Sequence, residues 1–287
     1  MMGTDDMLLA QRDGGSPMTL AAGSAPGESG VSVLSMRFRG GAHFNATTRQ
    51  HLVWFQSSRQ TPFHCRIAGR ALRHQPTVGS LAICPAQVDA TADAEGSVDA
   101  MVVMIDPNHL ALAAAEESAL CATLIERLSG YDQALFDLGR ELVIECVGHY
   151  PSGPLYWNEV ASNFIFALVA RHTSRPARPT RGSLGKDVLD RLRDYVLSHL
   201  DEPIEVATLA DIAGRSPFHF TRVFVRCVGL TPHRYIVHLR MRRAIELIRD
   251  GRMGLAEIAA RTGFADQSHL SRWARRIHGV PLTQLAA

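Results

Sequence analysis

Residues 209–224 read Leu-Ala-Asp-Ile-Ala-Gly-Arg-Ser-Pro-Phe-His-Phe-Thr-Arg-Val-Phe, and residues 258–273 read Ile-Ala-Ala-Arg-Thr-Gly-Phe-Ala-Asp-Gln-Ser-His-Leu-Ser-Arg-Trp. In both stretches a small alanine follows an aliphatic residue, a glycine comes four positions after that alanine, and an amphipathic segment follows. The alanine lets two helices approach closely, the glycine makes the turn between them, and the second helix offers polar side chains to DNA. The repeated pattern therefore predicts two helix-turn-helix motifs.

The residues at the starts of the second helices agree with this prediction. Ser216 is the expected N-cap of the first reading helix, and Pro217 stands at the first helical position, where its missing N–H costs nothing. Asp266 is the expected N-cap of the second reading helix, over residues 267–277. Helical spacing turns four apolar residues toward the core: Phe220, Val223, Phe224 and Leu270.

Side chains left on the outer face of each reading helix are the candidates for contact with DNA. The base-reading candidates are Phe218, His219, Thr221 and Arg222 in the first copy, and Gln267, Ser268 and Arg272 in the second. Glutamine suits adenine, arginine suits guanine or a phosphate, and serine suits either. The candidate phosphate clamps are Arg222, Arg226, Arg275 and Arg276. The alternative for Arg222 and Arg272 is an ion pair inside the domain, for instance with Asp211 or Glu257.

A long helix is predicted between the two motifs. It begins at the N-cap and proline pair Thr231-Pro232 and ends at Asp250-Gly251. At ~1.5 Å per residue, about 18 residues span roughly 27 Å. One turn of DNA is roughly 34 Å long. A connecting helix of this length can hold two reading helices near successive major grooves on one face of DNA.

At these residues the chain resembles the AraC/XylS family of bacterial transcription regulators. The resemblance runs from about Val188 to Leu285, and it is carried by the two motifs, by Gly229-Leu-Thr-Pro-His-Arg-Tyr, by Arg240-Met-Arg-Arg-Ala and by the closing Gly279-Val-Pro. It implies a seven-helix domain whose two reading helices insert into adjacent major grooves of double-stranded DNA. By position, the family's reading residues map to Phe218, Thr221, Arg222, Gln267, Ser268 and Arg272. The resemblance also implies RNA polymerase as a partner and a homodimer.

Two departures from the family pattern occur at the ends of the reading helices. The family usually has an aromatic residue followed by a basic one, whereas this chain has Phe224-Val225 and Trp273-Ala274. The first departure removes a phosphate contact, and the second implies that the core aromatic of the second motif is displaced or missing. We therefore expect the second copy, with Gln267, Ser268 and Arg272, to make more of the hydrogen-bonded reading.

The N-terminal part of the chain is predicted to be a β-barrel or sandwich followed by helices. Five short apolar or alternating segments are separated by turn residues: Val31–Phe38, His51–Phe55, Phe63–Ile67, Ser80–Cys84 and Val98–Ile105. Helical spacing follows over Asn108–Glu117, Tyr131–Gly148 and Leu155–His172. This part is similar, more weakly, to the cupin-like effector and dimerisation domains often fused to AraC-type modules. The predicted fold class is α+β, a cupin-like barrel with two closing helices and an all-α domain.

Composition divides the chain into four segments. Residues 1–30 are rich in Gly, Ser, Ala and Asp and are expected to be a disordered tail. The effector domain covers residues 31–172, a Pro- and Arg-rich linker residues 173–185, and the DNA-binding domain residues 186–287. Residues 186–287 carry a net charge of +5 and residues 1–185 a net charge of −3, which suits nucleic-acid binding at one end only. The arginines of the linker either contact phosphates or stay solvated.

The remaining observations bear on compartment and chemistry. Five scattered cysteines without a C-x-x-C pair, and no run of roughly 20 apolar residues, predict a cytoplasmic protein with reduced thiols and no membrane span. No His-x-His occurs between residues 31 and 106, so we expect no metal, no cofactor and no catalysis there. Three hypotheses stay open for the N-terminal domain: it senses a small-molecule effector, it serves dimerisation only, or it is a cupin-type enzyme tethered to a DNA-binding module.

Overall fold

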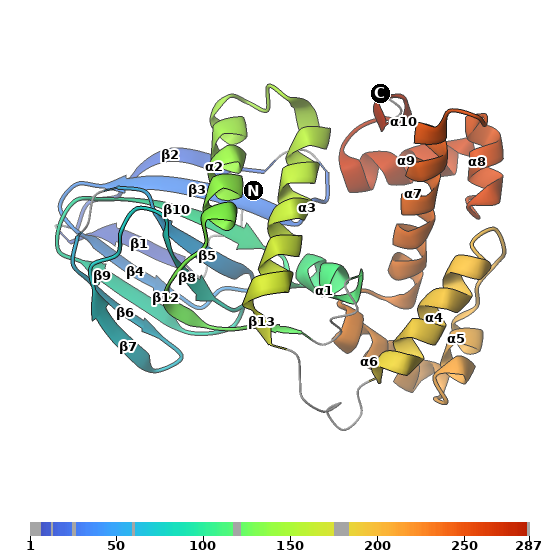
Figure 1. Cartoon of the computed structure of the whole chain (residues 1–287), viewed down its shortest axis with the longest axis horizontal. Helices are drawn as coiled ribbons and strands as arrows, with labels where there is room; N and C mark the ends of the chain where they lie inside the picture. Colours follow the sequence, from blue (N-terminus) through green and yellow to red (C-terminus); the bar gives the residue numbers. More distant parts are fainter. Residues whose placement is uncertain are drawn as a thin grey trace. The chain divides into compact units, whose positions relative to one another are not determined.

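The computed structural model describes residues 7–12, 14–24, 27–58, 61–116, 122–174 and 184–285 (Figure 1). The chain divides into two compact units. The sheet unit consists of Met1–Ala25, Gly30–His109 and Thr123–Ser174, and the helix unit of Pro26–Ser29, Leu110–Ala122 and Arg175–Ala287. Of the linker predicted over 173–185, residues 175–183 lie outside the described ranges.

The sheet unit contains two larger antiparallel sheets. One has the strand order β1-β4-β9-β6-β7 and the other β12-β8-β5-β10-β3-β2. The strands are β1 (Met7–Gln11), β2 (Met18–Gly23), β3 (Val31–Phe38), β4 (Ala42–Ala46), β5 (His51–Gln56), β6 (Phe63–Ile67), β7 (Arg70–His74), β8 (Ser80–Cys84), β9 (Ala90–Ala94), β10 (Val98–Ile105) and β12 (Arg127–Tyr131). A third, two-stranded sheet pairs β11 (Thr123–Leu124) with β13 (Thr173–Ser174).

All five strands predicted from the sequence are present, as β3, β5, β6, β8 and β10. Their buried side chains from both sheets meet in one core that includes Phe38, Phe44, Leu52 and Ile67. The segment expected to be a tail differs from that expectation, because it contains β1 and β2. These strands add to sheet edges through backbone hydrogen bonds, β1 along β4 and β2 along β3, and bury little side chain. The amino-acid composition of these two segments therefore does not predict strands.

Three helices occur after β10, close to the predicted ranges: α1 (Pro107–Glu116), α2 (Gln133–Val147) and α3 (Gly153–His172). Asp132 caps α2 by accepting a hydrogen bond from the backbone N–H of Leu135. Helix α2 packs against β2, β3, β10 and α3, and at Gly139 a Cβ would come within 2.8 Å of the Met101 side chain. Figure 1 shows α2 and α3 side by side next to the sheets.

The helix unit contains α4 (Lys186–Ser198), α5 (Val206–Ile212), α6 (Pro217–Val228), α7 (Pro232–Asp250), α8 (Leu255–Arg261), α9 (Gln267–His278) and α10 (Leu282–Leu285). Figure 1 shows α4, α5 and α6 at one end of α7, and α8, α9 and α10 at the other. The core beneath α4, α5 and α6 includes Leu192, Leu209 and Phe220, and Leu112 of α1 also belongs to it. Within the described ranges, no helix has the length and apolar character needed to cross a membrane.

Candidate nucleic-acid interface

Both predicted turns are made by a glycine in the left-handed region. Gly214, between α5 and α6, has a φ of +63°, and Gly263, between α8 and α9, has a φ of +69°. Residues other than glycine adopt this backbone conformation at a cost in free energy, which explains why glycine stands at both turns. The two sites differ in their surroundings. A Cβ at Gly214 would meet nothing within 4 Å, whereas one at Gly263 would overlap the carbonyl oxygen of Leu200.

The two helices predicted to read DNA, α6 and α9, begin where the sequence predicts. Ser216 is the N-cap of α6 with Pro217 in the first turn, although the Ser216 side chain makes no capping hydrogen bond. At the second copy, the Asp266 carboxylate accepts a hydrogen bond from the backbone N–H of His269 at 2.6 Å. The backbone at the start of α9 is therefore fixed by its cap, and Gln267 and Ser268 lie in the turn that this cap orders.

Helix α6 turns its predicted core side chains inward and its predicted reading side chains outward. Phe220, Val223 and Phe224 are at most 1% exposed. Phe218 is 76% exposed and lies beneath the guanidinium of Arg222, whose Cζ is 6.0 Å from the ring centroid. A single exposed apolar ring is common on protein surfaces, so the position of Phe218 in the first turn of α6 carries more information than its exposure. This position fits apolar contact with a thymine methyl group.

The other two polar candidates of α6 already have partners in the protein. The Thr221 hydroxyl donates to the carbonyl oxygen of Pro217 at 2.9 Å. The Arg215 guanidinium lies 2.8 Å from Nε2 of His219, and because arginine can only donate, His219 accepts through that nitrogen. The hydrogen-bonding capacity that α6 offers to a base is therefore smaller than its sequence suggests.

Helix α9 has a more open polar face. Leu270 and Ala274 are completely buried, whereas Gln267, Ser268, Arg272 and Arg275 are exposed. With Ser271 they line a shallow depression on the helix surface. Ser271 was not singled out from the sequence, although its spacing of four residues from Gln267 could have indicated it. Five polar side chains thus form one stripe along α9.

In the structure the aromatic of α9 is displaced from the core position of the second motif. Ala274 occupies the buried position that Phe224 holds fifty residues earlier. Trp273 lies partly exposed beside it, and its indole N–H donates to Nε2 of His269 at 3.0 Å. The buried aromatic ring of this motif is Phe264, which comes from the turn before α9 and not from the reading helix.

The alternative of an ion pair for Arg222 or Arg272 is not realised within the described ranges. Glu257 instead pairs with Arg261 one helical turn away, at 3.1 Å. Arg222, Arg226, Arg272 and Arg275 are all exposed, and in the described part of the chain none has an ion-pair partner. Their charges are available to an external anion.

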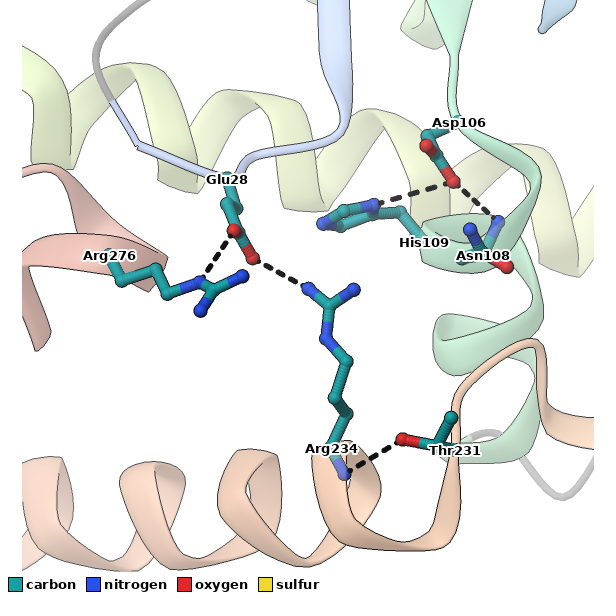
Figure 2. Close-up of polar contacts among 7 residues, drawn as sticks. All are labelled: Glu28, Asp106, Asn108, His109, Thr231, Arg234 and Arg276. Atoms are coloured by element: carbon teal, nitrogen blue, oxygen red, sulfur yellow. Dashed lines mark hydrogen bonds and ion pairs between the residues drawn. The ribbon is translucent and has the colours of Figure 1, made fainter. Parts of the chain in front are cut away.

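Arg276 differs from the other predicted phosphate clamps, because its guanidinium pairs inside the helix unit. Nε of Arg276 lies 3.0 Å from one carboxylate oxygen of Glu28, and an Nη atom of Arg234 lies 2.7 Å from the other. The backbone N–H of Glu28 also donates to the carbonyl oxygen of Ile277, at the end of α9. Figure 2 shows the two arginines reaching Glu28 from different helices, α9 and α7.

The C-terminal part of the chain matches a known family. A family described as "Helix-turn-helix domain" matches residues 209–287, the range from α5 to the end of the chain. This range contains both motifs and the connecting helix α7, and the C-terminal part of the chain is an AraC-type helix-turn-helix domain.

Individual relatives agree over the same part of the chain. The "Probable transcriptional regulator LumQ" of Photobacterium leiognathi is 33% identical over 91 residues, which cover 32% of this chain and 37% of LumQ. The "HTH-type transcriptional activator RhaS" of Enterobacter sp. (strain 638) is 34% identical over 88 residues, covering 31% of this chain and 32% of RhaS. The chain thus spans about a third of the length of the curated relatives it matches.

A solved structure is also similar in this region. The DNA-binding domain of AdpA in complex with a target DNA is 28% identical, covering 34% of this chain and 87% of that one, with a TM-score of 0.32.

Proposed function

We propose that this chain is a sequence-specific DNA-binding regulator of transcription, in which α6 and α9 read adjacent major grooves of double-stranded DNA. The observation that carries the proposal is the pair of motifs at opposite ends of α7 (Figure 1). Helix α7 has 19 residues, and at ~1.5 Å per residue it is about 28 Å long. Two reading helices held apart by this length suit half-sites about one turn of DNA, roughly 34 Å, apart.

The surface chemistry of α6 and α9 supports unequal roles in reading. Gln267, Ser268 and Arg272 offer a donor and acceptor set that can address adenine and guanine edges. On α6 the hydroxyl of Thr221 is engaged by the helix backbone, while Phe218 offers apolar contact. We infer that α9 makes most of the base-specific hydrogen bonds and that α6 contributes shape, apolar contact and charge.

The first experiment identifies the DNA site with the full-length protein. Selection from a random duplex library should enrich two short conserved blocks about one helical turn apart. Fluorescence anisotropy on the selected duplex then measures the dissociation constant. Inserting 5 base pairs between the blocks turns one half-site by about half a turn, so specific binding should be lost. Enrichment of no sequence, or equal binding after the insertion, would contradict the proposed reading mode.

The second experiment tests the role of Arg272. The Arg272→Ala variant should bind the selected site about 1–3 kcal/mol more weakly and should lose preference at one base position, as expected for loss of a bidentate contact. Arg70→Ala, on the sheet unit, removes the same charge from an exposed position and serves as the control. Equal affinities for the wild type and Arg272→Ala would remove that residue from the interface.

For the whole chain, we propose a small-molecule-responsive regulator. Residues 31–172 form a cupin-like domain that senses an effector and holds a homodimer together, and residues 186–287 form a seven-helix DNA-binding domain after a linker. RNA polymerase is the proposed partner on DNA and the cytoplasm the proposed compartment. Supports for this proposal are the two-sheet architecture, the closing helices α2 and α3, and the basic charge of the C-terminal part.

The alternative, a cupin-type enzyme tethered to a DNA-binding module, makes a different prediction. Such an enzyme would hold a metal with a set of His, Cys, Asp or Glu side chains. Among the residues described, no group of three or more such side chains is arranged to hold a metal ion. Metal analysis of the purified full-length protein decides between the two, since a stoichiometric transition metal would favour the enzyme.

A further inference from the structure

A cavity lies between the two larger sheets of the sheet unit, and we name it the intersheet cavity. One wall comes from β4, β6, β7 and β9 of the first sheet, and the other wall comes from β3, β5, β8, β10 and β12 of the second sheet. It holds about 100 Å³ of free space. An apolar cavity of ~150 Å³ in another protein stays dry and admits benzene. The intersheet cavity therefore suits a guest close to one six-membered ring in size.

The walls of this cavity are apolar and aromatic. Phe44 and Trp54 meet edge to face, with ring centroids 4.3 Å apart, and Phe63 faces His74 across 6.4 Å. None of the described residues that line the cavity is an aspartate, glutamate, lysine or arginine. A charged guest would have to leave water without an opposite charge to receive it, at a cost of many kcal/mol.

The titratable side chains in the walls are uncharged near pH 7. Burial raises the pKa of the Cys65 thiol to about 11 and that of the Cys84 thiol to about 12, with smaller contributions from nearby carboxylates. Burial also lowers the pKa of His74. The walls therefore offer no positive or negative charge to a guest, either from their residue types or from the protonation states of their titratable side chains.

Most polar groups in the walls are already bonded to the protein. The Cys84 thiol donates to the carbonyl oxygen of Val88 at 3.4 Å, and the Ser80 hydroxyl accepts from the backbone N–H of Thr77 at 3.0 Å. Nε2 of His74 lies 3.6 Å from the Cys65 sulfur. A sugar carries several hydroxyl groups, each of which needs a new partner once it leaves water. The remaining polar side chains in the described walls are those of Gln56, Thr91 and Trp54, which are too few to replace those partners.

Among the described residues of the walls, one solvent-shielded side-chain donor lacks a partner. The indole N–H of Trp54 is shielded from solvent, and among the described residues nothing accepts its hydrogen bond. Buried donors are rarely left unsatisfied, because the lost hydrogen bond to water is not replaced. A guest with a single acceptor atom that reaches this N–H would restore the bond.

We propose that the intersheet cavity binds an uncharged, largely apolar molecule about the size of one six-membered ring, with one acceptor atom for the indole N–H of Trp54. The guest class excludes carboxylates and sugars. The biological meaning of the site, as the effector site of a regulator, rests on the proposed function, but binding itself is measurable without DNA.

The test uses the full-length protein and two probes of nearly equal shape, cyclohexanone and methylenecyclohexane, followed by ligand-observed NMR titration. Both should bind saturably at millimolar concentration or below, as small apolar ligands of this size do. Benzoate and glucose should show no saturable binding at the same concentrations. Absence of binding by both ring probes, or preferential binding of benzoate or glucose, would overturn the proposal.

Two variants place the binding in the cavity. Ala82 pairs with Trp54 across β8 and β5 and lines the cavity, so Ala82→Leu should fill part of it and weaken both ring probes at least tenfold. The matched control is Ala71→Leu, at an exposed position of β7 outside the lining. Equal weakening in both variants would overturn the location. Circular dichroism and a second filling variant, Ala92→Leu, guard against misfolding.

The role of the indole N–H is tested by Trp54→Phe, which keeps an aromatic ring and removes the donor. The affinity ratio of cyclohexanone to methylenecyclohexane should fall about threefold to tenfold, the usual worth of one hydrogen bond. An unchanged ratio would remove Trp54 as the donor. Anisotropy on the selected DNA is run on the same samples. If the wild-type protein binds the probes but not DNA, the proposed function alone is contradicted. If it binds DNA but not the probes, the cavity proposal alone is contradicted.

Discussion

Substituting alanine for the two turn glycines should have very different effects, although the sequence gives both residues the same role. Gly214 and Gly263 both have a positive φ, so alanine at either position takes on a strained backbone. For an L-residue this conformation costs ~1–2 kcal/mol. At Gly214 nothing lies within 4 Å of the new Cβ. The strain is therefore the whole effect, and Gly214→Ala should destabilise the helix unit by about 1–2 kcal/mol.

At Gly263 a steric clash adds to the strain. The new Cβ would overlap the Leu200 carbonyl oxygen and come within 2.6 Å of the Arg240 guanidinium, which donates to the Glu202 carbonyl oxygen at 2.6 Å. Displacing Arg240 costs a charge-assisted hydrogen bond, about 1.5–3 kcal/mol. Together with the backbone strain, Gly263→Ala should cost roughly 3–5 kcal/mol.

Hydrogen–deuterium exchange of the full-length protein, read by mass spectrometry, separates the two effects. The opening free energy of peptides from α8 and α9 should fall steeply in Gly263→Ala, and that of peptides from α5 and α6 only slightly in Gly214→Ala. Peptides from the sheet unit serve as the internal control and should not change. Equal losses in the two variants would refute the reasoning, because the backbone strain would then account for both.

Three further predictions concern other parts of the chain. Burial lowers the pKa of His51 to about 4, opposed by Asp106, so stability present above pH 6.5 should be lost as the pH falls toward 4, by at most ~3 kcal/mol. The His51→Asn variant keeps an acceptor for the Ala86 N–H, and its urea-denaturation midpoint should depend less on pH over this range. A midpoint that depends on pH as steeply as that of the wild type would contradict the assignment. Glu28→Gln should lower the stability of the helix unit by about 0.5–1 kcal/mol at low salt and less at 0.5 M salt, measured by hydrogen exchange of α7 and α9, and a salt-independent loss would argue against the ion pairs. Gln267→Ala should relax base preference more than Thr221→Ala in selection experiments, and the reverse order would contradict the division of labour between the reading helices.

The features that the sequence predicts well are determined by neighbouring residues. The starts of α6, α7 and α9 match the N-cap and proline signals within a residue, because a cap acts on the turn that follows it. Strand β3 matches its predicted bounds for a related reason, since it is rich in apolar residues and lies between Gly30 and the Gly40-Gly41 pair.

The features that the sequence does not reveal depend on contacts between distant residues. Glu28 and Arg234 are 206 positions apart, and nothing in either local pattern indicates that one carboxylate holds arginines from two helices. The N-terminal strands depend on backbone pairing at sheet edges, which leaves almost no trace in side-chain pattern. The engagement of the Thr221 hydroxyl is likewise invisible, because a serine or threonine bonded to its own helix reads as a free polar residue.

The discontinuous composition of the helix unit has a consequence for protein engineering. A fragment beginning at residue 186 would contain every helix of the DNA-binding domain, but it would lack Glu28 and the buried Leu112. Such a fragment would carry two arginines without their shared counter-charge and an uncovered apolar surface. Domain exchange between regulators of this kind therefore requires that the recipient protein supply residues equivalent to Glu28 and Leu112. Otherwise the segments that carry these two residues must be transferred together with the helices.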